Sequence, residues 1–272
     1  MHKEFRLALI QMKVMETKEA SVDRAVLNVA RVSEKGAEVV VLPEMFNCPY
    51  ETHLFSDYAE EEGGYTWQKL SEAAERNKVY LIGGSIPERE EDRLYNTSYI
   101  FDPKGKCIGK HRKIHMLDID IVNGQYFRES DALSAGETPT IVETEFGKIG
   151  VAICYDIRFP ELSRYMVSKG AGVLIFPAAF NMTTGPAHWE LLLRSRAVDN
   201  QVYTVGCAPA RDYDLGYISY GHSMVVNPWG DVIGELNEDE GYLVGQIDLE
   251  AEQTIRDQLP LLKHLKKEKY TL

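Results

Sequence analysis

The feature that most constrains the fold is an alternation of short apolar runs with amphipathic segments along the whole chain. The runs are rich in Val and Ile, which is typical of strands buried on both faces. Strands are therefore predicted at residues 7–11, 39–42, 79–83, 98–101, 107–110, 149–154, 173–176, 202–207, 223–226 and 243–247.

Apolar residues at helical spacing predict helices between these strands. The helices are centred on residues 22–30, 67–74, 160–170 and 189–197. The strand–helix order occurs twice, in residues 5–110 and 141–247. Two similar halves predict two sheets packed face to face, each covered by helices on its outer side. The predicted fold class is therefore α/β, a four-layer α-β-β-α sandwich. Since no linker divides the sequence, residues 1–272 are predicted to form a single domain.

Charge and cysteine usage narrow the function classes. Thirty Lys and Arg residues against 42 Asp and Glu residues give a net charge of −12. Such an acidic chain is poorly suited to bind nucleic acid or anionic membranes. No apolar run approaches the ~18 residues of a membrane span, and the N-terminus lacks an apolar signal segment. The four cysteines are scattered without paired spacing, which favours reduced thiols. We expect a cytoplasmic protein without a nucleic-acid or membrane partner.

Three predicted strands end on side chains of complementary chemistry. Glu44 follows the strand at 39–42, Lys113 follows the strand at 107–110, and Cys154 ends the strand at 149–154. Catalytic groups of α/β proteins collect beyond the carboxyl ends of strands. A thiol that acts as a nucleophile needs a base such as Glu44, and a cation such as Lys113 stabilises the resulting oxyanion. Each residue alone has an ordinary structural explanation, but the combination favours nucleophilic catalysis.

Two further groups extend this constellation. Glu129, in a loop-like region between the halves, is predicted to orient Lys113 or to position an attacking water. Tyr155 follows Cys154 at a predicted strand-to-helix turn. Its backbone N–H is therefore a natural second donor to the oxyanion, beside Lys113.

Other constellations are weaker. Ser223 lies in a Gly-His-Ser-Met-Val segment that lacks the second glycine of a serine nucleophile elbow. His111 and His115 have the spacing of a helical zinc pair, but neighbouring cations crowd them and no further ligand motif accompanies them.

A sequence does not reveal which side chains meet in space. A dyad of Cys154 with His188 or with His222 therefore stays open as an alternative to the Glu44 base.

Several motifs resemble the nitrilase superfamily of carbon–nitrogen hydrolases. They are Leu42-Pro43-Glu44, His111-Arg112-Lys113 and the segment from Ala152 to Glu161, and the resemblance extends over about residues 5–260. The segments 46–50, 127–130 and 180–189 resemble the ω-amidase branch.

The resemblance implies an α-β-β-α sandwich and a triad of Glu44, Lys113 and Cys154, with Glu129 as a second glutamate. It also implies that the protein uses no metal or organic cofactor. Members of the superfamily pair near the nucleophile, so a homodimer or a higher homo-oligomer is expected.

The implied reaction is hydrolysis of the terminal amide of a small dicarboxylic monoamide to the acid and ammonia through a cysteine thioester. Candidate substrates are 2-oxoglutaramate, 2-oxosuccinamate and succinamate. Arg158 is expected to bind the second carboxylate, since a guanidinium binds a carboxylate bidentately. Further candidate substrate contacts are Thr184, Tyr50 and Tyr155.

Alternatives remain at this point. Arg158 is also close enough in sequence for a surface ion pair with Glu161. Within the superfamily, nitrile hydrolysis, N-carbamoyl-amine hydrolysis and general aliphatic amide hydrolysis share these motifs. A non-catalytic scaffold is the alternative outside enzymes.

Overall fold

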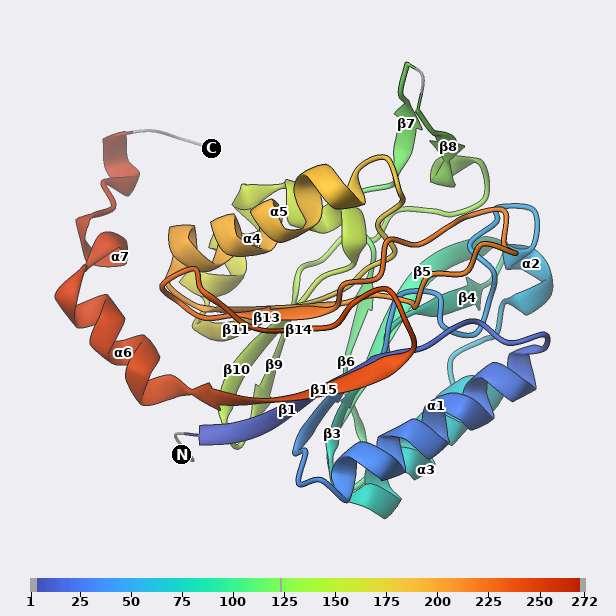
Figure 1. Cartoon of the computed structure of the whole chain (residues 1–272), viewed down its shortest axis with the longest axis horizontal. Coiled ribbons are helices and arrows are strands. Elements are labelled where there is room, and N and C mark those ends of the chain that lie inside the picture. The colour runs from blue at the N-terminus through green and yellow to red at the C-terminus, as the bar shows by residue number, and fades with distance from the viewer. Residues whose placement is uncertain (1–3, 123, 270–272) are drawn as a thin grey trace.

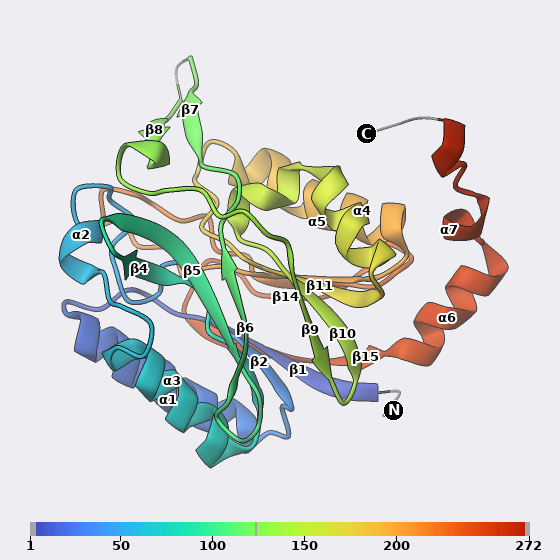
Figure 2. The same cartoon turned by 180° about the vertical axis from the view of Figure 1, so that it is seen from behind.

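Two mixed β-sheets lie face to face in the computed structural model, which describes residues 4–122 and 124–269. Helices cover the outer side of each sheet (Figures 1 and 2). The predicted α-β-β-α sandwich is thus confirmed. An apolar core fills the space between the sheets.

Each sheet mixes parallel and antiparallel pairing. The first has the order β15 (Gly241–Asp248), β1 (Glu4–Gln11), β2 (Val39–Val41), β3 (Tyr80–Ile82), β5 (Arg93–Phe101) and β4 (Ile86–Glu90), and β6 (Cys107–Arg112) also pairs with β5. The second has the order β14 (Val232–Glu235), β13 (Met224–Val226), β12 (Tyr203–Cys207), β11 (Ala171–Pro177), β10 (Gly147–Val151) and β9 (Thr140–Thr144). A separate hairpin, β7 (Asp118–Asp120) and β8 (Tyr126–Arg128), projects at one end of the sandwich (Figure 1).

Two longer helices cover the outer face of each sheet. The α-helices are α1 (Lys18–Ser33), α2 (Phe55–Tyr58), α3 (Tyr65–Asn77), α4 (Pro160–Ser168), α5 (Gly185–Asn200), α6 (Leu249–Gln258) and α7 (Leu261–His264). The 3₁₀ turns are η1 (Glu129–Asp131), η2 (Cys154–Arg158) and η3 (Lys267–Lys269). Helices α1 and α3 pack on the first sheet, and α4 and α5 pack on the second. None of the helices within the described ranges has the length and apolar character that a membrane crossing requires.

Alternation along each strand explains the layers. In β1, Leu7 and Leu9 face the second sheet, whereas Ala8 and Ile10 face the helices. Successive side chains of a strand point to opposite faces, so a strand in a middle layer must be apolar on both. The Val- and Ile-rich runs satisfy this requirement.

One predicted strand joins a different sheet from the one expected. The run at 243–247 was grouped with the second sheet, but it forms β15 of the first sheet. It pairs antiparallel with β1, from Glu4 opposite Asp248 to Gln11 opposite Gly241. The end of the chain thus returns to the first sheet and covers the edge of its first strand. Local apolar pattern identifies a strand but not its partner.

Candidate active site

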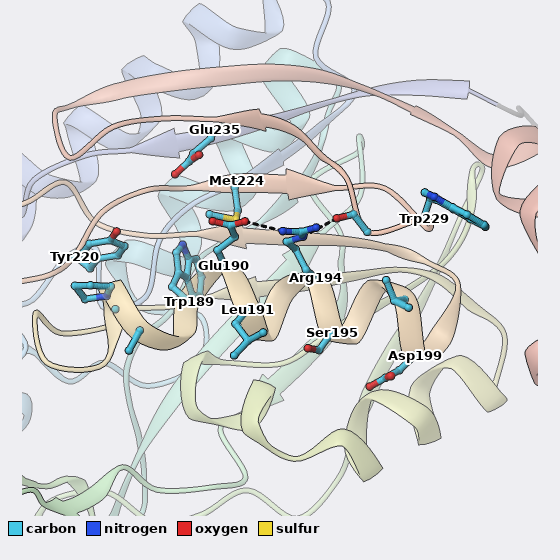
Figure 3. Close-up of a pocket in the computed structure, with 15 residues that line it drawn as sticks. Trp189, Glu190, Leu191, Arg194, Ser195, Asp199, Tyr220, Met224, Trp229 and Glu235 are labelled. Carbon is cyan, nitrogen blue, oxygen red and sulfur yellow. Dashed lines mark hydrogen bonds and ion pairs between the residues drawn. The ribbon is translucent and has the colours of Figure 1, made fainter.

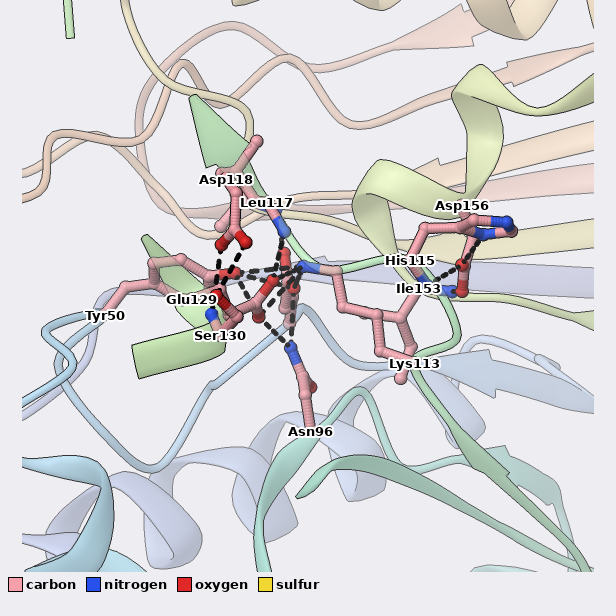
Figure 4. Close-up of polar contacts among 12 residues, drawn as sticks. Tyr50, Asn96, Lys113, His115, Leu117, Asp118, Glu129, Ser130, Ile153 and Asp156 are labelled. Atoms are coloured by element: carbon pink, nitrogen blue, oxygen red, sulfur yellow. Dashed lines mark hydrogen bonds and ion pairs between the residues drawn. The ribbon is translucent and has the colours of Figure 1, made fainter. Parts of the chain in front are cut away.

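The three predicted side chains Glu44, Lys113 and Glu129 meet in the interior. Glu44 lies in the turn after β2, Lys113 follows β6, and Glu129 begins η1. Lys113 Nζ lies 3.1 Å from Glu44 Oε1 and 2.7 Å from Glu129 Oε2, and all three side chains are completely buried. Figure 4 shows the Lys113 ammonium directed at Glu129 and at the groups around it.

The turn that carries Glu44 depends on a close approach of two loops. Gly84 has a φ of +57°, and a Cβ there would lie 2.1 Å from the Pro43 carbonyl oxygen. Glycine alone adopts this conformation without a side-chain clash. Beside it, Ser85 Oγ accepts a hydrogen bond of 3.0 Å from the Met45 N–H. The Gly83-Gly84 turn thus positions the general-base candidate.

Tyr50 and Asn96 bind both carboxylates. The Tyr50 hydroxyl lies 2.9 Å from Glu129 Oε1 and 3.2 Å from Glu44 Oε1, and Asn96 Nδ2 lies 2.8 Å from Glu44 Oε1 and 3.2 Å from Glu129 Oε1. Lys113 Nζ also donates to the Tyr50 hydroxyl at 3.1 Å. Tyr50, expected to contact substrate, thus lies within the charged cluster, with its hydroxyl already engaged. Asn96 was not predicted, because it lies outside the strand expected at 98–101 and its burial is apparent only in the folded chain.

The charge of Lys113 is secured by its partners. Burial alone would lower the pKa of this ammonium, but Glu129 and Glu44 outweigh burial and raise it above its usual range. Lys113 is therefore a permanent cation, as oxyanion stabilisation requires.

Cys154 occupies a sharp turn between β10 and α4. Strand β10 ends at Val151, and η2 begins at Cys154 with a φ of +46°. A left-handed conformation at a non-glycine residue is uncommon, and such residues cluster at active sites. The backbone N–H of Tyr155 lies at the open N-terminal end of η2, where N–H groups have no partner within the helix.

The Cys154 thiol is neutral at rest. Burial, and then the charge of Glu44, raise its pKa well above the usual value, although Lys113 opposes them. Glu44 also forms a hydrogen bond with the thiol. This carboxylate can therefore take the sulfur proton as the sulfur attacks, so that no free thiolate accumulates.

A third carboxylate, Asp156, links the Lys113 segment to the Cys154 turn. Buried Asp156 accepts hydrogen bonds from His111 Nε2 at 3.0 Å and His115 Nδ1 at 2.7 Å, and its Oδ2 accepts from the Ile153 N–H at 3.0 Å. His111 and His115 lie two residues to either side of Lys113, so Asp156 joins the Lys113 segment to the Cys154 turn. Burial would raise the pKa of Asp156, but the two imidazoles reverse this and hold it below its usual range.

The histidines and the serine of the alternative constellations have other partners. His111 and His115 bind Asp156, and no group of three metal-ligating side chains occurs within residues 4–122 and 124–269. Ser223 Oγ donates to Gln11 Oε1 at 2.8 Å in the interior. His188 Nδ1 lies 3.2 Å from Arg158 Nη1, and His222 Nδ1 lies 3.0 Å from Glu235 Oε1.

A pocket opens beside Cys154. Its walls include Tyr155, Arg158 and Thr184, three of the predicted substrate contacts. The remaining lining residues are Leu117, Ala179, Phe180, Asn181 and Tyr217. The Arg158 guanidinium lies 5.0 Å from the centre of the Phe180 ring. In the part of the chain that the structure describes, Arg158 forms no ion pair with Glu161.

A wider groove of about 650 Å³ runs along α5 beside β13 and β14 (Figure 3). Leu191, Arg194 and Trp229 line it, and it includes neither Cys154 nor any other predicted site residue. The site chemistry therefore lies in the smaller pocket at the strand ends.

Comparison with known proteins agrees with this geometry. Residues 6–257 match the sequence model of the carbon–nitrogen hydrolase family. The chain belongs to this family. Carbon–nitrogen hydrolases form the nitrilase superfamily, so the predicted family and enzyme class are both confirmed.

Two relatives show how closely this carbon–nitrogen hydrolase follows known members. It is 48% identical to the omega-amidase NIT2 of Mus musculus over 98% of this chain and 97% of the relative. Nit3 from Saccharomyces cerevisiae, whose crystal structure is known, is 42% identical in sequence. The two structures match with a TM-score of 0.90 over 98% of this chain and 97% of that one.

A more distant amidase shows cysteine chemistry. The amidase of Nesterenkonia sp. AN1 is 25% identical, with a TM-score of 0.78, and covers 96% of this chain and 100% of that one. In a crystal structure of a variant of that enzyme, acrylamide has added to the active-site cysteine.

Proposed function

We propose that this carbon–nitrogen hydrolase is an amidase that hydrolyses the terminal amide of a small dicarboxylic monoamide. The candidate substrates are 2-oxoglutaramate, 2-oxosuccinamate and succinamate. Similarity to an omega-amidase over the whole chain supports this class of substrate.

The single observation that carries the proposal is the charge of the pocket. Arg158 is the only charged side chain among the described residues that line it, in a protein with a net charge of −12. A guanidinium on a pocket wall, partly shielded by the ring of Phe180, is suited to bind a carboxylate at a fixed distance from the sulfur. Thr184 lines the same pocket, and its hydroxyl, which donates to Asn181 Oδ1 at 3.1 Å, can still accept a hydrogen bond from the substrate.

Acylation then proceeds in two steps. Glu44 accepts the proton of the Cys154 thiol while the sulfur attacks the amide carbon, and Lys113 and the Tyr155 N–H stabilise the oxyanion. The protonated Glu44 gives this proton to the amide nitrogen, the C–N bond breaks, and ammonia leaves a thioester behind.

Deacylation repeats the sequence with water. Glu44 takes a proton from water, whose oxygen attacks the thioester carbon. The C–S bond breaks, and the sulfur recovers its proton from Glu44. Glu129 stays paired with Lys113 throughout and keeps the ammonium directed at the oxyanion.

A substrate panel tests the proposal. Ammonia release is measured for 2-oxoglutaramate, succinamate, a carbamoyl amine, an uncharged aliphatic amide and an aliphatic nitrile, with Cys154→Ala beside the wild type. We expect the two acidic amides to be turned over fastest and Cys154→Ala to be inactive. Preference for another member of the panel assigns the enzyme to that reaction, and the absence of any turnover favours a scaffold.

Arg158→Lys examines the carboxylate contact separately. Lysine keeps the charge but loses the fork of two N–H donors. We expect a higher KM for acidic amides and little change for uncharged ones. Equal losses on both would contradict the role of Arg158.

We also propose a homodimer or a higher homo-oligomer in a reducing cytoplasmic setting. The four cysteines are free thiols, which supports a reducing compartment. Leu191 and Trp229 expose apolar surface along the groove of α5, which supports an interface between subunits. Light scattering during gel filtration tests the assembly. A monomeric mass across the working concentration range would contradict it.

A further inference from the structure

Glu44 borders a second cavity, which adjoins the pocket beside Cys154. This cavity of about 20 Å³ lies between Glu44 and the loop at 209–219, whereas the substrate pocket lies beside Cys154. Its lining residues are Val14, Glu44, Met45, Cys48, Tyr50, Ala179, Pro209, Ala210, Asp212, Leu215, Tyr217 and Ser219. Ala179 and Tyr217 line both spaces, so the two adjoin.

We propose that this cavity is the binding site of the water that hydrolyses the thioester, and that Ser219 holds that water for Glu44. The inference rests on the proposed function, because it concerns the second half of the same reaction. It adds a water site and a residue that the family motifs do not include.

The cavity is large enough to hold a water. A water needs roughly 10–15 Å³ at this measure and two to four polar partners. Glu44, Asp212 and Ser219 supply polar atoms along the lining. Glu44, at the catalytic cluster, is completely buried, whereas Asp212 is partly exposed. The cavity lining therefore extends from the catalytic cluster toward the surface.

Ser219 supplies an independent observation. Its side chain is only 6% exposed, and its Oγ has no hydrogen-bond partner within the described part of the chain. A buried hydroxyl without a partner is unfavourable, and such groups are usually satisfied by internal water. The neighbouring Tyr217 hydroxyl is already engaged, since it donates to the Ala179 carbonyl oxygen at 2.5 Å. The Tyr50 hydroxyl is engaged by Glu44 and Glu129, so Ser219 supplies the available hydroxyl of the cavity lining.

The chemistry requires a site of this kind. Once the acyl group is on Cys154, it fills the pocket between Arg158 and the sulfur, which blocks the route that the substrate used. A water held in the adjoining cavity stays in contact with Glu44 and keeps access to the thioester carbon. In the deacylation step, that water loses a proton to Glu44 and forms the new C–O bond, the C–S bond breaks, and Glu44 returns the proton to the sulfur.

Ser219→Val tests the proposal, and Ser219→Thr is its matched control. The two variants have the same side-chain volume, but only threonine keeps the hydroxyl. A p-nitrophenyl ester acylates the enzyme and reports acylation by its colour, independently of the amide preference. Intact mass after acid quenching then gives the fraction of acyl-enzyme and its rate of hydrolysis.

We expect Ser219→Val to slow deacylation by about tenfold while acylation changes less than about twofold, because a misplaced reactant affects only its own step. Acyl-enzyme should accumulate, and Ser219→Thr should deacylate several times faster than Ser219→Val. Equal deacylation in the two variants, or an equal loss in acylation and deacylation, would overturn the proposal.

Two measurements keep the outcome clear. If Ser219→Val does not fold, Ser219→Ala removes the hydroxyl without added bulk and should slow deacylation in the same direction, so wild-type deacylation in that variant would overturn the proposal. Failure of the proposed function is visible separately, as a wild-type enzyme that deacylates the ester normally but releases no ammonia from any amide.

Discussion

At the scale of single residues, the site is a balance of buried charges. Two carboxylates, Glu44 and Glu129, share one ammonium, Lys113, so the group formally carries one negative charge. A thiolate added to it would bring a second negative charge into a buried space. This is why the Cys154 pKa is raised, and why the proton must move to Glu44 during attack rather than before it.

Glu44→Gln tests whether Glu44 is the group that accepts the proton. Glutamine keeps the shape and can still accept from Asn96, but it cannot take a proton. We expect kcat to fall by about 10²–10⁴-fold, the usual contribution of a general base. The measurement is ammonia release, with Glu16→Gln at an exposed position as the control. Activity of Glu44→Gln near the wild-type value would show that another group is the base.

At the scale of elements, one carboxylate connects the two halves of the site. Asp156 lies in η2 with the nucleophile, and its histidine partners flank Lys113 at the end of β6. Since these elements belong to different sheets, this contact fixes the cation relative to the sulfur. Its effect on catalysis is one of position, because Asp156 does not line the pocket.

Asp156→Asn is expected to destabilise the protein by about 1–3 kcal/mol at neutral pH, as for a buried hydrogen-bonded group that loses its charge. The folded-state pKa of Asp156 lies below its usual ~3.9, so its stabilisation is complete above about pH 4 and is lost as the pH falls toward the folded-state pKa. The advantage of the wild type should therefore shrink below about pH 4. Urea unfolding at several pH values measures it, and a difference independent of pH would contradict this role.

At the scale of the whole molecule, β15 connects two distant parts of the chain, because it pairs with the first strand of the fold. It pairs with β1 along eight residues, and Ile247 enters the core between the sheets. Without it, β1 would be an exposed edge of a largely apolar sheet, which favours aggregation.

Truncation tests this role. A chain of residues 1–240 lacks β15 and is expected to aggregate or to unfold without a cooperative transition. A chain of residues 1–260 keeps β15, α6 and the hydrogen bond from Gln201 Nε2 to the Leu259 carbonyl oxygen, and it should unfold cooperatively. Thermal unfolding followed by circular dichroism distinguishes them, and similar cooperative transitions in both would show that β15 is dispensable.

Some of this architecture was readable from the sequence, and some was not. The strand ends at Glu44, Lys113 and Cys154 were predictable because each follows a local apolar run, and the structure brings them together. The partner of β15 and the bonds of Asn96 were not, because local pattern carries no information about which distant segments meet. Tyr50 was expected at the substrate, but only the folded chain reveals that its hydroxyl lies between two carboxylates.

The acyl-enzyme itself provides the most direct test of the central claim, that the sulfur of Cys154 carries the substrate through a covalent intermediate. The wild type and Cys154→Ala are mixed with succinamate, quenched in acid within a turnover, digested and analysed by mass spectrometry. We expect a succinyl adduct on the peptide that contains Cys154, and no adduct in Cys154→Ala. An adduct on another residue, or ammonia release by Cys154→Ala at the wild-type rate, would contradict that claim.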